Sequence, residues 1–310
     1  YESITASATT TLDSIARAST VSASNVAMGS ATTIAISRAS SSFTHTLTYA
    51  FGNVTGTIAT KTTSISVSWT PPLTLANQIP KAVTGTCTIT CTTYNGNTSI
   101  GSKTCTLTLS VPASVKPTIT SLTAARVDGA VPSAWGIYVQ TKSKATLTIN
   151  GAAGSYGSTI SSYSITGGGY TSTASSFTTG FLNTSGTVTF TATVTDSRGR
   201  VSTAATVSIS VVAYSPPSFV SSLSQRCLSN GAANDDGTYI RGQVSYSYAS
   251  CSSKNTITRA TYYKKASDTA WTNASAAFSS GTAFTFGGEK ISTETSYDIK
   301  YTLTDAFTTI

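Results

Sequence analysis

The sequence predicts an all-β protein that is built from tandem antiparallel β-sandwich domains. Three observations support this prediction: a low content of charge, a strict alternation of apolar and hydroxyl side chains, and a repeat near 100 residues. Charged residues are only 10% of the 310 residues, whereas a typical soluble domain has about 25%. Serine and threonine take their place, and the β-branched threonine favours strands.

The alternation marks the strands. Residues 187–196 alternate threonine with apolar side chains, turn at an Asp-to-Gly segment, and alternate again through residues 207–211. This pattern is typical of a β-hairpin. The same phrase occurs over residues 86–96, continuing into 105–109, and begins a third time over residues 297–305. We therefore expect three equivalent hairpins, the third of which stops at its turn.

The tips of these hairpins carry equivalent polar residues. Asp196 and Asp305 follow the outgoing strands, and Thr93 stands at the matching place in the first hairpin. A short polar side chain at a turn accepts hydrogen bonds from nearby backbone N–H groups. We expect Asp196 and Asp305 to fix their turns in this way, and Thr93 to do the same more weakly.

A proline-marked segment follows each complete hairpin. Residues 117–122 are answered by residues 217–223, and Arg126 by Arg226, 100 positions later in each case. This period is far too long for a propeller blade or a solenoid repeat, and it fits tandem immunoglobulin- or fibronectin-like sandwiches of several short strands.

The repeats give the expected domain limits. We predict that residues 1–11 are the end of a preceding domain or a linker strand. Two complete immunoglobulin-like sandwiches should follow over residues 12–116 and 117–215, and a third, incomplete sandwich over residues 216–310. Junctions that contain proline restrict the backbone more than glycine- or serine-rich linkers do. We therefore expect a semi-rigid array of domains that acts as a spacer.

The five cysteines are distributed unevenly. Cys87, Cys91 and Cys105 fall in the first domain, Cys227 and Cys251 in the third, and the second has none. A scaffold that depends on disulfides would repeat its pairs in each domain. We interpret all five as reduced core residues of a protein assembled in a reducing cytoplasm; whether Cys91 and Cys105 form a bridge across their hairpin stays open.

The sequence offers little catalytic chemistry. His45 is the only histidine, and it shares one face of a strand with aromatic and aliphatic side chains, which favours packing over catalysis. Asp235 and Asp236 precede a glycine, so a turn is favoured over a calcium site that would also use Asn234. We expect no enzyme, and no catalytic, metal-binding or cofactor-binding residue; no cofactor is predicted.

Three aromatic residues of the third domain are the candidate binding residues. Tyr262 and Tyr263 are adjacent, so one of them must face outward, and Trp271 follows closely. Exposed aromatic side chains beside polar groups stack on sugar rings, whereas inward ones pack the core. We therefore consider Tyr262, Tyr263 and Trp271 as a contact for a glycan, with packing as the alternative.

The net charge and the hydropathy of the sequence bear on which classes of partner the protein can bind. The formal net charge of +8 comes from 19 thinly spread cations, so we expect no binding of nucleic acid. A mild attraction to anionic polymers such as phosphate-bearing cell-wall glycans stays open beside the simpler interpretation that the charge only keeps the protein soluble. No apolar run is long enough to span a bilayer, and no insertion into a membrane is expected.

Several separated phrases resemble a known family. Residues 14–21 and 38–47, and Arg226 followed by residues 235–240, resemble minor structural proteins from the tails of siphophages that infect Gram-positive bacteria. The resemblance covers most of the chain and concerns structural modules, not an active site. It implies a virion protein at or near the tail tip that touches the host envelope. Residues 131–135 depart from the pattern, so any ligand of the Asp-Asp-Gly turn would be lost in the second domain.

These observations together predict a structural or fibre protein of a phage tail, whose repeats space or form a surface that binds the host. The alternatives are a bacterial cell-surface adhesin or stalk, and carbohydrate-binding accessory repeats of a wall-active enzyme. The expected partners are other tail proteins of the virion and the host cell-wall polysaccharide, and association into a homo-oligomer stays open. The expected location is the tail or tail tip of the virion, after assembly in the host cytoplasm.

Overall fold

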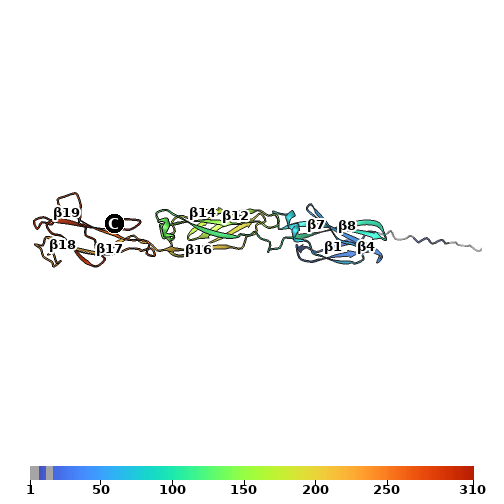
Figure 1. Ribbon diagram of the computed structural model, residues 1–310. Helices are drawn as coiled ribbons and strands as arrows, with labels where there is room; N and C mark the ends of the chain where they lie inside the picture. Colours follow the sequence, from blue (N-terminus) through green and yellow to red (C-terminus); the bar gives the residue numbers. More distant parts are fainter. Residues whose placement is uncertain (1–6, 12–16) are drawn as a thin grey trace, which may run out of the picture. The chain divides into compact units, whose positions relative to one another are not determined.

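The structure is a computed structural model that describes residues 7–11 and 17–310 (Figure 1). In this part of the chain, all secondary structure is β-strand apart from two short 3-10 helices. The strands form six sheets, and each sheet takes its strands from only one of the stretches 20–110, 121–212 and 218–304. We call the two sheets of each stretch the first, second and third sandwich. The predicted all-β, immunoglobulin-like fold class is confirmed.

The first sandwich contains eight strands and one 3-10 helix: β1 Thr20–Ala23, β2 Val26–Ala27, β3 Thr32–Ser37, β4 Phe43–Phe51, β5 Val54–Thr62, β6 Ser66–Trp69, η1 Leu73–Gln78, β7 Thr84–Asn95 and β8 Thr98–Ser110. Its sheets have the strand orders β1-β3-β6 and β2-β8-β7-β4-β5.

The second sandwich repeats this arrangement: β9 Ser121–Val127, η2 Ser133–Trp135, β10 Tyr138–Val139, β11 Lys144–Asn150, β12 Ile160–Gly167, β13 Tyr170–Ser172, β14 Ser176–Thr178, β15 Gly186–Asp196 and β16 Ala205–Val212. Its sheets have the orders β14-β11-β9 and β10-β16-β15-β12-β13.

The third sandwich has six strands: β17 Ser218–Cys227, β18 Tyr239–Ser247, β19 Thr258–Lys265, β20 Thr272–Asn273, β21 Ala283–Gly287 and β22 Tyr297–Thr304. Its sheets have the orders β17-β18-β21 and β20-β19-β22. In this described stretch, β22 is hydrogen-bonded along its length to β19, and its other neighbour is the single bridge Thr304↔Thr309.

Two short pairs differ from the predicted antiparallel pairing. β2 pairs in parallel with the end of β8, and β10 pairs in parallel with the end of β16. In each case the preceding strand, β1 or β9, belongs to the opposite sheet. The chain therefore crosses from one sheet to the other between β1 and β2, and again between β9 and β10. β2 and β10 then run parallel to the last strand of their own sandwich, β8 or β16.

The alternation read from the sequence forms the cores. In β4, every second side chain is buried from Phe43 to Leu47, and the first core gathers residues such as Leu47, Ile89 and Leu109 at no measurable exposure. Phe190 is likewise fully buried in β15. Each such side chain stabilises the fold by about 1.5–3 kcal/mol on burial. The threonines between them in β4, Thr44 and Thr46, are only partly buried.

Packing divides the described residues into two compact units. The first unit extends to Thr120 and includes residues 150–164 and 193–204; the second comprises residues 121–149, 165–192 and 205–310. This division does not test the predicted domain limits, which stay a prediction. Residues 7–11 are exposed and form no strand, and the rest of the predicted segment 1–11 lies outside the described residues.

The hairpin tips confirm the predicted role of both aspartates. The Oδ1 atom of Asp196 accepts hydrogen bonds from the backbone N–H groups of Arg198 and Arg200 at 3.0 and 2.9 Å. Asp305 Oδ1 accepts those of Phe307 and Thr308 at 2.8 and 2.9 Å. Both carboxyl groups are buried, so each tip is a fixed loop.

Thr93 does not have the expected role. Its Oγ1 accepts a hydrogen bond from the backbone N–H of Ser19 at 2.9 Å, and this donor does not belong to the turn. The reason is that β7 and β8 continue to pair beyond Thr93 as far as Asn95↔Thr98, so the turn lies further out and is closed by backbone bonds.

We predict that Asp196→Ala lowers the free energy of unfolding by about 1–3 kcal/mol, because it leaves buried donors without an acceptor. The donors are the two tip amides and the Ser158 hydroxyl, which lies 2.8 Å from Asp196 Oδ2. Denaturant unfolding of the 310-residue chain measures this. The exposed Asp268→Ala is the control, for which we expect less than about 0.5 kcal/mol. Equal effects of both variants would contradict the prediction.

Candidate functional site

His45 is a packed core residue, as the sequence analysis favoured. It is fully buried, and its Nε2 atom lies 2.8 Å from the hydroxyl of Ser19. Burial lowers the pKa of His45, and the nearby Arg38 lowers it further. Among the residues that the structure describes, His45 is in no ion pair, whereas a catalytic base needs a partner within hydrogen-bond reach.

The Asp235–Asp236 segment forms the predicted turn. The Oδ1 atom of Asn234 accepts a hydrogen bond from the backbone N–H of Asp236 at 2.9 Å, and Gly237 donates to the carbonyl of Asn234 at 3.0 Å. Both aspartates are exposed. Over the described residues, no group of three or more His, Cys, Asp or Glu side chains has a geometry that could hold a metal ion.

All five cysteines are free thiols in the structure. Burial raises the pKa of each thiol, and that of Cys87 reaches about 11. The thiolate is the reactive form of cysteine, so these side chains behave as small apolar groups. They belong to the cores and not to a site.

The first candidate site is a junction between two sandwiches that lies within the first compact unit. The Asp196 loop presents Arg198, whose guanidinium donates to the carbonyl oxygens of Ala76 at 2.8 Å and Ile79 at 3.2 Å. It also donates to Ser155 and Tyr156 of its own sandwich. Arg198 is only 8% exposed, so its four bonds are shielded from water and hold the end of the first sandwich to the tip loop of the second.

The neighbours of Arg198 reinforce this junction. Ser197 donates its hydroxyl to the carbonyl of Pro80 at 2.5 Å, and Arg200 donates to that of Val111 at 3.1 Å. All acceptors on the first sandwich are backbone carbonyls around η1 and the end of β8. Because hydrogen bonds depend on direction, these bonds hold the tip loop to particular carbonyls of the first sandwich.

The second compact unit contains an equivalent junction with different chemistry. Phe307 stands two positions after Asp305, as Arg198 does after Asp196, and its ring meets those of Trp135 and Tyr214 edge-on, with centroids 5.6 and 4.8 Å away. Val131, Val139 and Cys251 are buried and complete this apolar cluster. The third sandwich is therefore held to the second by aromatic packing.

A buried carboxyl–phenol contact adds to the second junction. Tyr214 donates its hydroxyl to Asp305 Oδ2 at 3.2 Å, and Asn255 donates to the same atom at 3.0 Å. Burial alone would raise the pKa of Asp305, but the bonds from Asn255, the Phe307 and Thr308 amides and Tyr214 together lower it. Burial and the Asp305 charge raise the pKa of Tyr214 to about 12.

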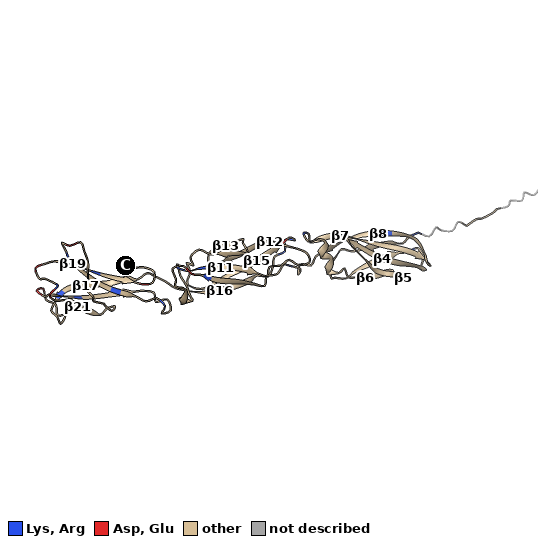
Figure 2. Cartoon of the chain, turned by 45° about the horizontal axis from the view of Figure 1, so that its top comes forward, with Lys and Arg blue, Asp and Glu red and all other residues tan. Residues whose placement is uncertain are grey.

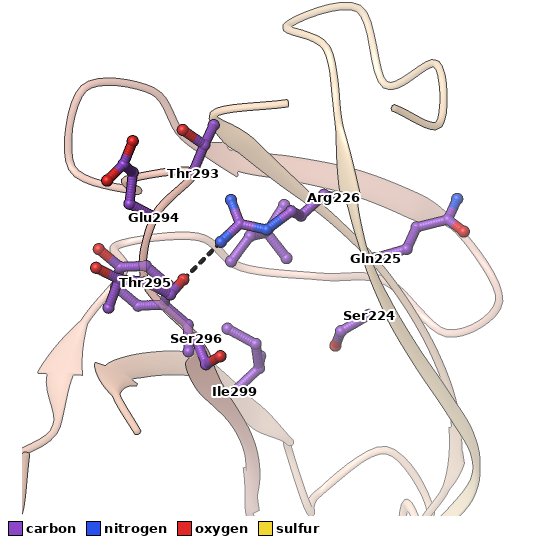
Figure 3. A pocket seen from close by; sticks show the side chains of 10 residues that line it. Ser224, Gln225, Arg226, Thr293, Glu294, Thr295, Ser296 and Ile299 are labelled. Atoms are coloured by element: carbon purple, nitrogen blue, oxygen red, sulfur yellow. Dashed lines mark hydrogen bonds between the residues drawn. The ribbon is translucent and has the colours of Figure 1, made fainter. Parts of the chain in front are cut away.

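The third sandwich also has a cavity of about 490 Å³ between β17 and the loop before β22 (Figure 3). Arg226 points into it, and Gln225 points away. The guanidinium of Arg226 is already occupied, because it donates to the carbonyls of Thr295 at 2.7 Å, Ser292 at 3.0 Å and Gly237 at 3.1 Å. Arg226 thus anchors the loops around the cavity with its N–H donors.

The structure separates the three candidate aromatic residues of the third sandwich. The ring of Tyr263 packs in the core against Phe286 and Tyr297, with centroids 6.2 and 6.3 Å away. Tyr262 and Trp271 both contact the ammonium of Lys300, which lies 4.6 Å from each ring centroid. The glycan-contact hypothesis therefore narrows to Tyr262 and Trp271, which lie on the outer face of the β20-β19-β22 sheet.

Charged side chains are sparse in every sandwich (Figure 2). The described residues contain two ion pairs, Arg126–Asp128 and Lys264–Asp298. No helix in the described part of the chain has the length and apolar character needed to cross a membrane.

This fold and these junctions define a protein of tandem immunoglobulin-like sandwiches. The chain belongs to the family described as "Siphovirus protein of unknown function (DUF859)", whose model matches residues 2–310. The resemblance to a siphophage family is thereby confirmed. No curated protein matches the chain.

Solved structures with similar tandem domains are remote. The three N-terminal domains of the highly immunogenic outer capsid protein (Hoc) of bacteriophage RB49 match 93% of this chain and 95% of theirs, at 12% identity and a TM-score of 0.32. The FN1–FN3 domains of chicken CNTN1 match 95% of this chain and 98% of theirs, at 9% identity and a TM-score of 0.27.

We predict a pH dependence of the second junction. Because the folded-state pKa of Asp305 is lowered, its charge stabilises the fold above about pH 4, and this contribution is lost as the pH falls through the lowered pKa. Amide hydrogen exchange at Phe307 and Thr308 should therefore accelerate between pH 5 and pH 3, after correction for intrinsic exchange, by more than in Asp305→Asn, which lacks the charge at every pH. An identical pH dependence in that variant would contradict the prediction, and Asp268→Asn is the exposed control.

Proposed function

We propose that this chain is a structural segment of a siphophage tail, whose immunoglobulin-like sandwiches space and carry a surface that binds the host. The observation that carries this proposal is the junction between the first and second sandwiches. Arg198 spans it with bonds to carbonyls on both sides and is nearly inaccessible to water. A protein that only needed linked domains would not require so directional a contact.

The second junction supports the same function by other means. Phe307, Trp135 and Tyr214 pack together, so apolar burial holds the third sandwich to the second. Membership of the siphovirus family makes a viral protein the starting point and weighs against a bacterial adhesin or an accessory module of a wall-active enzyme. A role without catalysis accords with the packed His45 and the exposed turn at Asp235.

The first experiment locates the protein in the virion. Antibodies raised against the 310-residue chain, coupled to gold, should label one end of the tail of purified particles in electron micrographs. Label on the head, or on host cells with particles unlabelled, would overturn the tail assignment. Pre-incubation of the antibodies with the purified chain is the control and should abolish the label.

We predict that Arg198→Met loosens the first junction. Leaving buried carbonyls without their donors costs about 1–3 kcal/mol, which corresponds to roughly a thirtyfold rise in the open population at the middle of that range. Cleavage of the segment between Val111 and Thr120 by subtilisin should accelerate accordingly, as followed by mass spectrometry.

Arg38→Met is the matched control for this variant. Arg38 also donates to backbone carbonyls, those of Thr63 and Phe43 at 2.8 and 3.5 Å, but both lie in the same sandwich. We expect its cleavage between Val111 and Thr120 to match the wild type. Equal acceleration in both variants would show that the effect is a general loss of stability and not a loosened junction.

A further inference from the structure

The outer face of the β20-β19-β22 sheet gathers aromatic rings and lysines. The cross-strand pairs Tyr262↔Lys300 and Lys264↔Asp298 are adjacent on β19 and β22, and Trp271 immediately precedes β20. Side chains directly opposite each other on neighbouring strands share one face of a sheet. We name these five residues the aromatic–lysine face.

The lysines of this face converge on one indole. Lys300 lies 4.6 Å and Lys264 5.4 Å from the centroid of the Trp271 ring. Lysine over an aromatic face is a favourable cation–π contact, but two ammonium groups near the same ring repel each other. The face therefore favours a partner that brings negative charge between them.

The single carboxylate of the face does not neutralise both cations. Asp298 forms an ion pair with Lys264 at 2.9 Å, and Lys264 also donates to the backbone carbonyl of Asp268 at 2.8 Å. Over the described residues, Lys300 is in no ion pair, and its contacts are the rings of Tyr262 and Trp271. One positive charge is thus left uncompensated beside two aromatic rings.

Both rings keep some exposure to solvent although lysine ammonium groups lie over them. Trp271 is 37% exposed, and Tyr262 is half-buried. The C–H surfaces of sugars and polyols pack on aromatic side chains that have one apolar and one wet end. A lysine ammonium binds phosphate as a point charge through charge-assisted hydrogen bonds. The face thus combines the groups that recognise a carbon backbone carrying phosphates.

We propose that the aromatic–lysine face binds an anionic polymer of polyol or sugar phosphate, with a phosphate at Lys300 and the adjoining polyol or sugar against Trp271 and Tyr262. The inference rests on the proposed function and names the chemical class of its host-surface ligand. A nucleic acid is not favoured, because binding of a single strand uses a continuous positive groove, whereas this face carries one uncompensated charge.

The test is calorimetric titration of the 310-residue chain with three probes at low and at physiological salt. The probes are poly(glycerol phosphate), dextran as a neutral polymer of matched length, and an oligo(dT) strand. We expect poly(glycerol phosphate) to bind and to weaken as salt rises, because an ammonium–phosphate contact on the surface is screened. Dextran and oligo(dT) should bind at least tenfold more weakly.

Variants locate the contact. Lys300→Gln and Trp271→Ala should each raise the Kd for poly(glycerol phosphate) at least tenfold. Lys103→Gln is the matched control, because it removes the same charge from an exposed position on β8 of the first sandwich, and its Kd should equal that of the wild type. Unchanged circular dichroism shows that each variant is folded; Lys300→Gln, a surface change, keeps the test valid should Trp271→Ala unfold.

Three results would overturn the inference: no binding of poly(glycerol phosphate), equal losses in Lys300→Gln and Lys103→Gln, or binding of dextran or oligo(dT) as tight as that of the phosphate polymer. These results are separate from a failure of the proposed function. Gold label on the tail with no polymer binding would leave the tail protein in place and remove only this ligand.

Discussion

The architecture of this chain depends on a buried carboxyl group at the tip of a hairpin. Asp196 binds the amides of the residues two and four positions later, and Asp305 those two and three positions later. Each aspartate thereby folds its loop so that the residue two positions on, Arg198 or Phe307, meets the preceding sandwich. Without the carboxylate these loop amides would lack their acceptors, and the anchor would have no fixed place.

The two junctions use this common frame for opposite kinds of chemistry. Arg198 makes hydrogen bonds, which depend on direction and tie a cation to particular carbonyls. Phe307 makes aromatic contacts, which tolerate small displacements and depend on the area removed from water. The Tyr214–Asp305 hydrogen bond adds direction to the second junction, and with it a sensitivity to protonation.

Sequence alone was sufficient wherever the determinant was local or periodic. The alternation over residues 187–196 fixed which side chains enter the core, and the short distance from Asp196 to Arg198 made the turn bond predictable. The partners of Arg198 on the first sandwich were not predictable, since they are backbone carbonyls more than 100 residues earlier. A usable signal was present: Arg198 and Phe307 occupy equivalent positions after equivalent aspartates. Which of Tyr262 and Tyr263 faces out likewise depends on strand register, which the sequence pattern left undecided.

Because charged side chains are scarce in this chain, the aromatic–lysine face differs chemically from the other outer sheet faces. On outer sheet faces made mostly of serine and threonine, hydroxyl groups bond to water and offer little to distinguish one partner from another. Lys300 departs from that background, because its positive charge is held by the rings of Tyr262 and Trp271 and not by a carboxylate. Tyr262 and Lys300 stand on paired strands, so they are ordered before a ligand arrives. Preorganisation of this kind reduces the entropy lost on binding, and the Phe307 junction extends that order from the third sandwich to the second.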